Sequence, residues 1–342
     1  MPRLCLIADD LTGALDTAAV FAGRGLATEV ALSPDDFPAV LASGAAVVAV
    51  STRSREGSAA AAAQAVAQVV AALPAELAVF KKVDSRLKGH VAAELAPLAP
   101  ERLLVAPALP EFGRLTRDGM LGGFGVAAPI AIAPLLGELA ARATIPDVAS
   151  DADLDAALAQ AGDALPVGAR GLAGALARRM TGRATATLLR PRGARVLAVI
   201  GSRDAITLPQ IEEVRAQSLA RWLPAPGGIL LEAAAQAPRL LVQAVPGPHP
   251  RAGAEVAAAL AASVHPRLTG GRDALILSGG ATAEAVLDAM GITRLRLLGE
   301  CLPGLPVARA GDLVIITKSG GFGARQTLAE VFAMLAAPAT TE

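Results

Sequence analysis

The sequence predicts an α/β fold of two doubly wound domains, each with a mainly parallel sheet and flanking helices. Short apolar runs alternate with longer segments whose apolar residues recur at helical spacing, which is typical of βαβ units. This alternation stops at a cluster of glycine, proline and arginine over residues 190–193 and then starts again. A chain of 342 residues is long enough for two domains. We therefore expect an N-terminal domain over residues 1–192 and a C-terminal domain over residues 193–342.

The N-terminal domain opens with an apolar run, residues 4–8, that ends in two adjacent carboxylates, Asp9 and Asp10. Leu15, Ala18 and Ala22 follow at helical spacing, so we expect a strand, an acidic turn and a helix. Further strands are expected at residues 27–32, 45–50, 77–80 and 103–107. Further helices are expected at residues 58–73, 91–98, 153–161 and 171–180. Glycine and proline interrupt the uncharged segment 121–137, which predicts a loop or a buried extended segment.

The C-terminal domain repeats the alternation of strands and helices. Strands are expected at residues 196–200, 228–231, 240–245, 274–277 and 313–316. Helices are expected at residues 207–219, 253–264, 283–290 and 324–335. Glycine-rich turns join the last two strands to the helices that follow them.

Composition excludes several functional classes. The 31 basic and 31 acidic residues balance, so the chain has no net positive charge to attract phosphates. There is no tyrosine and Trp222 is the one tryptophan, so aromatic side chains for base stacking are scarce. We therefore expect no nucleic-acid partner. The apolar segment 59–80 contains glutamine, proline and glutamate, which argues against a membrane span. The three histidines are widely spaced, so no metal site is predicted.

The cysteines and the N-terminus indicate a cytoplasmic protein. Cys5 and Cys301 lie far apart, the first in an expected buried strand and the second near an expected turn, which favours free thiols over a disulfide. Asp9 and Asp10 interrupt the first apolar run too early for a signal peptide, and this disfavours a periplasmic binding protein. The sequence leaves a homo-oligomer open.

The acidic pair Asp9–Asp10 is the first candidate site. Ligands of open α/β sheets bind beyond the carboxyl ends of the strands, where these two residues are expected. Adjacent carboxylates repel each other, so the pair favours a bound cation, a donor-rich ligand or a raised pKa. The alternative is that one aspartate caps the following helix and the other is solvated.

Basic residues follow two other strands of this domain. Arg53 and Arg55 follow the run 45–50, where they could hold an anion or belong to a solvated loop. Lys81, Lys82, Arg86 and Lys88 follow the run 77–80, together with Asp84 and Ser85. Because this basic run is fixed between a buried strand and an apolar helix, it favours an anion-binding site.

Two strand–glycine–helix units in the second half indicate a phosphate-binding site. The loops 278–282 and 317–323 each place glycines before a helix, and the second carries Lys318. Glycines let backbone N–H groups approach phosphate oxygens at a helix N-terminus. Neither loop is a Walker A motif or a G-x-G-x-x-G fingerprint, so the spacing alone does not separate ATP from NAD or a phosphosugar.

Several short motifs occur together in a fixed order: IADDLTGALD, Ser54–Arg55, FKKVDSRLKG, APALPEFGR, GSRDAITLPQI, SGGATAE and KSGGFG. In this combination the chain resembles the four-carbon acid sugar kinase family over almost its whole length. The resemblance implies ATP-dependent phosphorylation of the terminal hydroxyl of threonate, erythronate or 3-oxo-tetronate. It also implies an N-terminal acid-sugar domain and a C-terminal nucleotide domain.

The resemblance also assigns residues to the two halves. The substrate half receives Asp9, Asp10, Arg55, Lys82, Val83, Asp84 and Ser85. The nucleotide half receives Ser202, Gly279, Gly280, Ala281, Thr282, Gly320 and Gly321. The chain departs from the family pattern at Arg86, Lys88 and Ala281, and it is shorter than typical members.

Our hypothesis is in-line phosphoryl transfer from ATP to the acid sugar. Arg55 and the Lys82 region would hold the substrate carboxylate, and Asp10, or Asp9, would orient and deprotonate the attacking hydroxyl. The glycine loops and Lys318 would bind the triphosphate, and Mg²⁺ would bridge its oxygens. Two alternatives stay open: a catalytically weakened sensor of acid sugar or nucleotide, and an NAD(P)-dependent hydroxy-acid oxidoreductase.

Overall fold

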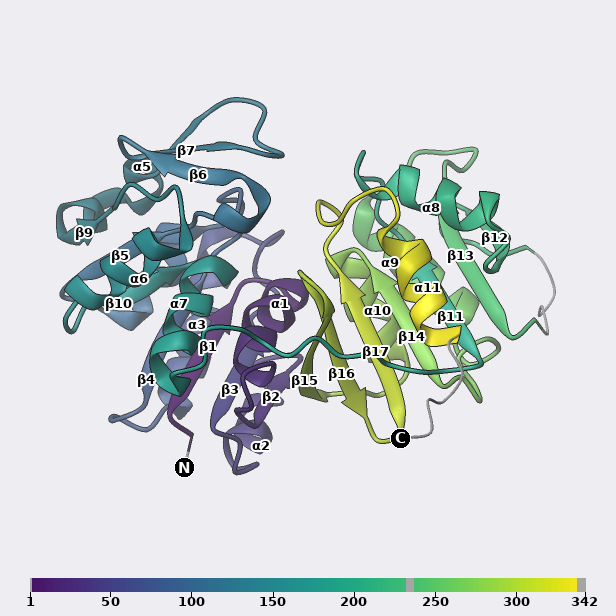
Figure 1. Cartoon of the computed structure of the whole chain (residues 1–342), viewed down its shortest axis with the longest axis horizontal. Coiled ribbons are helices and arrows are strands. Elements are labelled where there is room, and N and C mark those ends of the chain that lie inside the picture. The colour runs from purple at the N-terminus through teal and green to yellow at the C-terminus, as the bar shows by residue number, and fades with distance from the viewer. Residues whose placement is uncertain (1, 232–236, 337–342) are drawn as a thin grey trace. The chain divides into compact units, whose positions relative to one another are not determined.

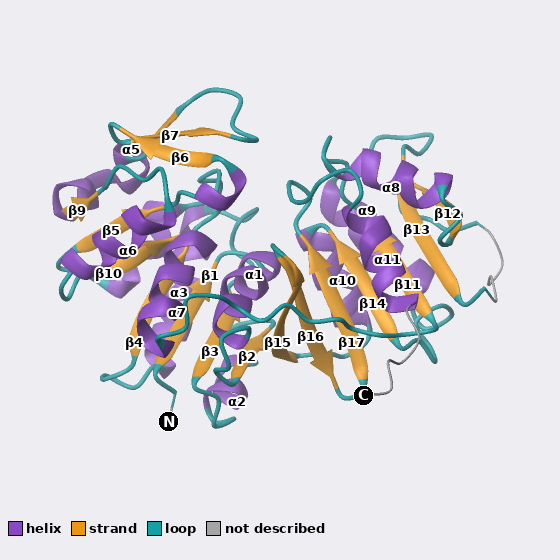
Figure 2. Ribbon diagram, in the orientation of Figure 1, coloured by secondary structure: helices purple, strands orange, loops and turns teal. Residues whose placement is uncertain are grey.

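The computed structural model describes residues 2–231 and 237–336 and divides into two compact units, Met1–Thr187 and Leu188–Glu342 (Figure 1). The division lies a few residues before the boundary expected from the Gly/Pro/Arg cluster at 190–193. Each unit contains its own sheet covered by helices, as Figure 2 shows by element type. The predicted α/β class, with mainly parallel sheets and flanking helices, is confirmed.

The sheet of the first unit has the strand order β2-β3-β1-β4-β10-β5-β9, and its pairs are parallel. Its strands are β1 (Leu4–Ala8), β2 (Thr28–Ala31), β3 (Val47–Ser51), β4 (Ala78–Lys82), β5 (Leu103–Ala106), β9 (Ala143–Thr144) and β10 (Leu165–Gly168). The chain places β3 and β2 on one side of β1 and then crosses to β4 on the other side. This change of direction makes the carboxyl end of β1 the switch point at which open α/β sheets bind ligands.

The described part of this unit also contains seven α-helices, three short 3₁₀ helices (Ala96–Leu98, Pro110–Phe112 and Gly137–Arg142) and a small antiparallel sheet. The helices are α1 (Leu11–Ala22), α2 (Phe37–Leu41), α3 (Ala59–Ala72), α4 (Val91–Leu95), α5 (Ala133–Leu136), α6 (Asp151–Gln160) and α7 (Arg170–Thr181). The small sheet consists of β6 (Arg114–Arg117), β7 (Met120–Gly123) and β8 (Ile130–Ala131). The segment 121–137 is therefore not simply a loop, because it contains β8, α5 and most of β7.

The sheet of the second unit has the order β12-β13-β11-β14-β17-β16-β15. Its strands are β11 (Val196–Ile200), β12 (Arg221–Pro226), β13 (Arg239–Val245), β14 (Ala274–Ser278), β15 (Arg294–Leu302), β16 (Leu305–Ala310) and β17 (Leu313–Lys318). Its helices are α8 (Thr207–Ala216), α9 (Gly253–Val264), α10 (Gly280–Ala289) and α11 (Thr327–Ala336). Pairing is parallel from β12 to β17, whereas β16 runs antiparallel to both of its neighbours.

One prediction for the second half was wrong, and two features were missed. The strand expected at residues 228–231 is absent, and the strand lies at β12, where Pro224 and Pro226 argue against one. Proline is tolerated there because β12 is the last strand of this unit's order and pairs with β13 alone in that order. The sequence analysis also missed the hairpin β15–β16, which fills the gap between α10 and β17.

Burial follows from the parallel pairing. Strands β1, β3, β11 and β14 are buried along their whole length, as expected when helices cover both faces of a sheet. Cys5 and Cys301 are both free and buried, and Cys301 lies near the end of β15, beside the turn at residues 303–304, as expected. Among the described helices, none combines the length and the apolar character needed to cross a bilayer.

A buried ion pair fixes α4 beneath the sheet's carboxyl edge. Lys81 Nζ lies 2.7 Å from Glu94 Oε2, and both side chains are almost fully buried. Ser54 Oγ donates to Glu94 Oε1 at 2.7 Å, which extends the contact to the loop after β3. The pair therefore connects β4, α4 and the β3 loop within one desolvated network.

We predict that Glu94→Ala lowers the free energy of unfolding by about 3–5 kcal/mol, because it leaves the Lys81 ammonium buried without its partner. Urea unfolding of the purified protein measures the change. Arg102→Ala is the matched control, since its ion pair with Asp163 is exposed on both sides and should contribute about 1 kcal/mol or less. Equal losses in the two variants would contradict the prediction.

Candidate functional site

Asp9 and Asp10 lie at the switch point of the first unit, directly after β1. Asp10 is the N-cap of α1: its Oδ1 accepts a hydrogen bond from the backbone N–H of Gly13 at 2.9 Å. Its Oδ2 accepts one from the Thr12 hydroxyl at 2.6 Å. The capping role considered from the sequence is therefore present, and it holds this carboxylate in one orientation.

Arg55 joins the two carboxylates. Its Nε and Nη2 donate to the two oxygens of Asp9 at 2.7 and 2.8 Å, and Nη2 also donates to Asp10 Oδ1 at 2.8 Å. A third carboxylate, Asp84, lies 3.6 Å from Nη1. Burial alone would raise the pKa of Asp9, but Arg55, with smaller contributions from Lys82 and Lys81, holds this pKa below its usual range.

The loop 83–89 lies against this cluster. Asp84 accepts hydrogen bonds from the backbone N–H groups of Arg86 and Lys88, and Val83 is buried in the core. Gly89 has a φ of +91°, and a Cβ there would lie 3.1 Å from Asp9 Oδ2, so glycine is required by both conformation and space. Ser85 accepts a hydrogen bond at 2.6 Å from Arg114, a buried arginine that the sequence analysis did not single out.

Lys82 is the last residue of β4, beside Ala8 in the sheet register. The residue is buried, and within the described ranges its ammonium makes no hydrogen bond and no ion pair. It lies against Gly13 of α1, where a Cβ would be 2.8 Å from its Nζ. The first unit therefore combines a carboxylate pair bridged by Arg55 with a neighbouring ammonium that contacts no counter-ion among the described residues.

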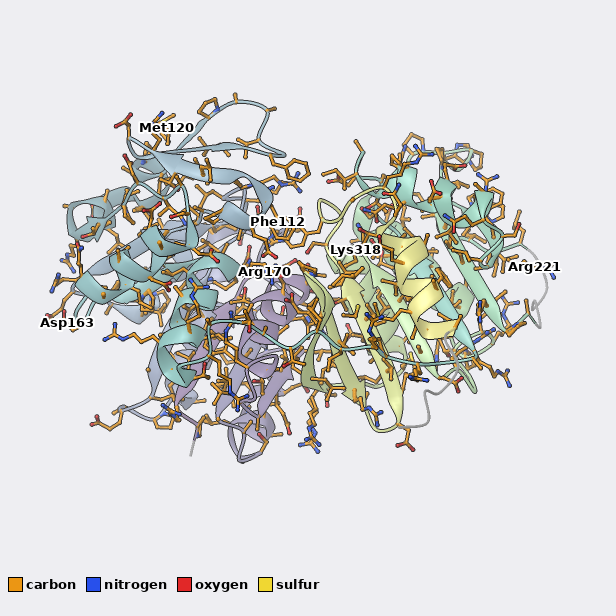
Figure 3. The ribbon with its side chains drawn as sticks, viewed as in Figure 1. Phe112, Met120, Asp163, Arg170, Arg221 and Lys318 are labelled. Carbon is orange, nitrogen blue, oxygen red and sulfur yellow. The ribbon has the colours of Figure 1, made fainter. Side chains whose placement is uncertain are left out.

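Another buried arginine, Arg170, contacts α1 through Asp16. Arg170 Nε lies 3.1 Å from Asp16 Oδ1, Nη1 donates to Glu111 at 2.9 Å, and the guanidinium faces the ring of Phe112 (Figure 3). Burial raises the pKa of Asp16 to about 6, against the opposing effect of Arg170 and Lys82. The motif APALPEFGR contains Glu111 and Phe112, but nothing in the sequence relates them to Arg170.

We predict that Gly13→Ala weakens acid-sugar binding by about tenfold or more while the protein still folds. The added Cβ would lie 2.5 Å from Asp10 Oδ1 and 2.8 Å from Lys82 Nζ, so both groups must move, whereas alanine itself favours the helix. Titration calorimetry with threonate and a melting curve check the two parts. Gly174→Ala in α7 is the control, because its nearest atom would be 3.7 Å away. Unchanged affinity in Gly13→Ala would refute the role of this contact.

In the second unit, three loops meet at neighbouring strand ends. Ile200, Ser278 and Lys318 are register partners on β11, β14 and β17. The backbone N–H groups of Gly201 and Ser202 donate to Ser278 O, and that of Gly279 donates to Lys318 O. The structure thus brings together Ser202, the 279–282 loop and the 318–321 loop, which the sequence analysis had assigned to the nucleotide.

Close packing explains the glycines of these loops. A Cβ at Gly201 would overlap Thr282 Oγ1, and one at Gly320 would overlap Ser202 Oγ. Gly279 has a φ of +102° and starts α10, which no side chain caps. Helix α10 begins at Gly280, earlier than expected, so Gly280, Ala281 and Thr282 form its first turn. Their N–H groups have no intrahelical partner and can meet an anion.

Lys318 ends β17 much as Lys82 ends β4, and its position is labelled in Figure 3. Its Nζ donates to Thr207 Oγ1 at 2.9 Å, Ser319 O at 3.0 Å and Gly320 O at 3.3 Å. Burial lowers the pKa of Lys318 to about 8, and Asp204 opposes this effect only in part. Thr207 and Asp204 belong to the motif GSRDAITLPQI, but their place at this lysine was not predicted.

We predict that Gly201→Ala weakens ADP binding by about tenfold or more, because the new methyl group must displace Thr282 and the first turn of α10. Gly253→Ala is the matched control at the start of α9, where an added Cβ meets nothing within 4 Å. Fluorescence or calorimetric titration with ADP distinguishes them. Wild-type affinity in Gly201→Ala would show that the nucleotide does not use this turn.

Comparison with protein families agrees with the two-unit architecture. Residues 4–129 match the model of a sugar-binding N-terminal domain, and residues 232–328 match that of a nucleotide-binding C-terminal domain. A sugar-binding domain followed by a nucleotide-binding domain is the arrangement expected of an enzyme that phosphorylates a carbohydrate.

Curated relatives specify the class further. The chain is 32% identical to a D-threonate kinase of Cupriavidus necator, over 94% of this chain and 95% of the relative. It is 30% identical to a D-threonate kinase of Bordetella bronchiseptica, over 96% of each. It is 28% identical to a 3-oxo-tetronate kinase of Methylobacterium radiotolerans, over 96% of this chain and 98% of the relative. The chain belongs to the four-carbon acid sugar kinase family, as the motifs indicated.

Solved structures support the fold. A protein of Salmonella typhimurium superposes with a TM-score of 0.72 at 19% identity, covering 98% of both chains. A protein of Haemophilus influenzae superposes with a TM-score of 0.66 at 20% identity, covering 97% of this chain and 100% of its own. At these identities the likeness concerns the architecture alone.

Proposed function

We propose that this kinase transfers the γ-phosphoryl group of ATP to the terminal hydroxyl of a four-carbon acid sugar such as threonate, erythronate or 3-oxo-tetronate. The observation that carries the proposal is that a carboxylate pair and the ammonium of Lys82 lie together at the switch point of the first unit. A fixed carboxylate pair suits a hydroxyl group, and the ammonium of Lys82, which contacts no carboxylate among the described residues, suits a substrate carboxylate. An acid sugar presents both groups.

Lys82 is the residue we assign to the substrate carboxylate. Arg55 was expected to share this task, but its guanidinium already contacts Asp9, Asp10 and Asp84. Its role in the proposal is therefore to hold the two aspartates in place and to balance their charge. Asp84 and Ser85 keep the loop beside Lys82 in position through the backbone of Arg86 and through Arg114.

Asp10 is the residue we assign to the attacking hydroxyl. Each oxygen of Asp9 accepts a hydrogen bond from Arg55, and Asp9 is the more deeply buried of the two, at 1% exposure against 8% for Asp10. Asp10 Oδ2 receives only the Thr12 hydroxyl among the described residues, so this oxygen keeps an acceptor position for a substrate O–H. It can orient the hydroxyl and accept its proton as the oxygen attacks the phosphorus.

The loops of the second unit fit a triphosphate. Glycines 201, 279 and 320 allow the backbone to approach closely, and the uncapped first turn of α10 offers N–H donors. Mg²⁺ that binds with ATP keeps most of its ligands as water and phosphate, and its charge would neutralise the transferring group.

We expect ADP release from Mg-ATP with at least one compound from a panel of D- and L-threonate, erythronate and 3-oxo-tetronates. A coupled assay with product analysis identifies the substrate and the phosphorylated carbon. No turnover on any compound, together with tight binding of ATP and a tetronate, would favour the sensor alternative. Stabilisation by NADH but not by ATP would favour the oxidoreductase.

We predict that Asp10→Asn lowers kcat by about 100- to 10,000-fold with little change in melting temperature. Asparagine still caps α1 through its amide oxygen, so the fold is kept while the proton acceptor is lost. Steady-state kinetics and a thermal melt measure the two effects, with the exposed Asp163→Asn as the control. An Asp10→Asn enzyme with wild-type kcat would remove Asp10 from the mechanism.

A further inference from the structure

The ammonium of Lys318 is enclosed by neutral oxygen atoms. An ammonium has three N–H donors, and those of Lys318 are directed to Thr207 Oγ1, Ser319 O and Gly320 O. The side chain is fully buried. A lysine that served as a mobile arm for phosphate would keep donors free, so this arrangement points to another role.

The contacts of Lys318 hold the phosphate loops together. Thr207, the first residue of α8, donates its own hydroxyl hydrogen to Gly320 O at 2.8 Å. Gly320 packs against Ser202, whose hydroxyl lies 3.4 Å from Thr207 Oγ1. Through these contacts the ammonium joins the loop after β17 to the start of α8 and to the loop after β11.

Among the residues that the structure describes, no anion contacts the ammonium of Lys318. The neighbouring elements present Ser278 on β14 and Thr207 on α8, which are uncharged. Asp204, on the loop after β11, is the charged group that acts on Lys318, and the hydrogen bonds of the Lys318 ammonium go to Thr207, Ser319 and Gly320 instead. A buried cation without a counter-charge is costly, and burial accordingly brings the pKa of Lys318 to about 8.

We propose that Lys318 is a positioning residue that does not touch the nucleotide, and that the bound phosphates supply the counter-charge its ammonium lacks. The proposal rests on the nucleotide assignment made above. Its consequence is a linkage between nucleotide binding and protonation. Phosphates raise the pKa of Lys318, so binding is tightest below pH 8, where the ammonium is already formed. Above pH 8, binding must take up a proton, and affinity falls as the pH rises.

Calorimetric titration with ADP between pH 7.5 and 9.5 tests this linkage, because the phosphates, whose last ionisation is near pH 6, do not titrate there. We expect the wild-type affinity to fall by about tenfold over this range. Repeating the titration in two buffers of different ionisation enthalpy should show proton uptake near pH 9. Lys318→Met should bind ADP more weakly at pH 7.5 and without this pH dependence. Arg296→Met, an exposed cation on β15, should behave as wild type.

The variant Thr207→Val distinguishes a positioning role of Lys318 from direct contact of Lys318 with phosphate. If Lys318 acts through the loops, Thr207→Val and Lys318→Met should weaken ADP binding to similar extents, and the double variant should lose little more. Additive losses would mean that Lys318 contacts phosphate directly and would overturn the positioning role. Wild-type binding without pH dependence or proton uptake would overturn the linkage even if Lys318→Met failed to fold. No ADP binding by the wild-type protein at any pH would instead overturn the nucleotide assignment itself.

Discussion

The two candidate sites of this kinase depend on buried lysines without a counter-ion in contact. Lys82 ends β4 in the first unit and Lys318 ends β17 in the second, and neither forms an ion pair within the part of the chain that the structure describes. Removing a cation from water without compensation costs free energy, so such positions persist where a ligand supplies the missing charge. A carboxylate is suited to Lys82 and a phosphate group to the loops around Lys318.

Several other buried charges near the acidic pair are satisfied internally. Arg55 is shared among Asp9, Asp10 and Asp84, Lys81 is paired with Glu94, and Arg170 is paired with Asp16 and Glu111. These contacts orient the acidic pair before any substrate binds, which is the form of preorganisation that phosphoryl transfer requires. These ion pairs leave the carboxyl ends of the strands densely charged and partly desolvated. The helices that begin there hold the charged groups in place.

Local sequence patterns were sufficient for most of the fold. Strand–turn–helix signals at residues 4–16, 274–282 and 313–323 placed the acidic pair and both glycine loops correctly at strand ends. The strand β12 was missed because its two prolines disfavour a strand unless it is an edge strand, and strand order is a tertiary property. The hairpin β15–β16 was missed because its antiparallel pairing breaks the alternation on which the analysis depended.

The sequence did not predict the side-chain geometry of the sites. The motifs indicated that Arg55 and Lys318 belong to anion-binding loops, but not that one faces three carboxylates and the other three neutral oxygens. Such partners come from different strands and are set by the strand order. The residues were therefore predictable as members of a site, whereas their division into ligand-binding and supporting roles was not.

The central claim is that Lys82 binds the carboxylate of the acid sugar, and the affinity of Lys82→Met for threonate tests it most directly. Calorimetric titration should give a dissociation constant about 10- to 100-fold above that of the wild type, as expected for a lost charge-assisted hydrogen bond, with ADP affinity unchanged. Wild-type affinity for threonate in Lys82→Met would contradict this assignment. The carboxylate of the acid sugar would then have to bind another cation of the site.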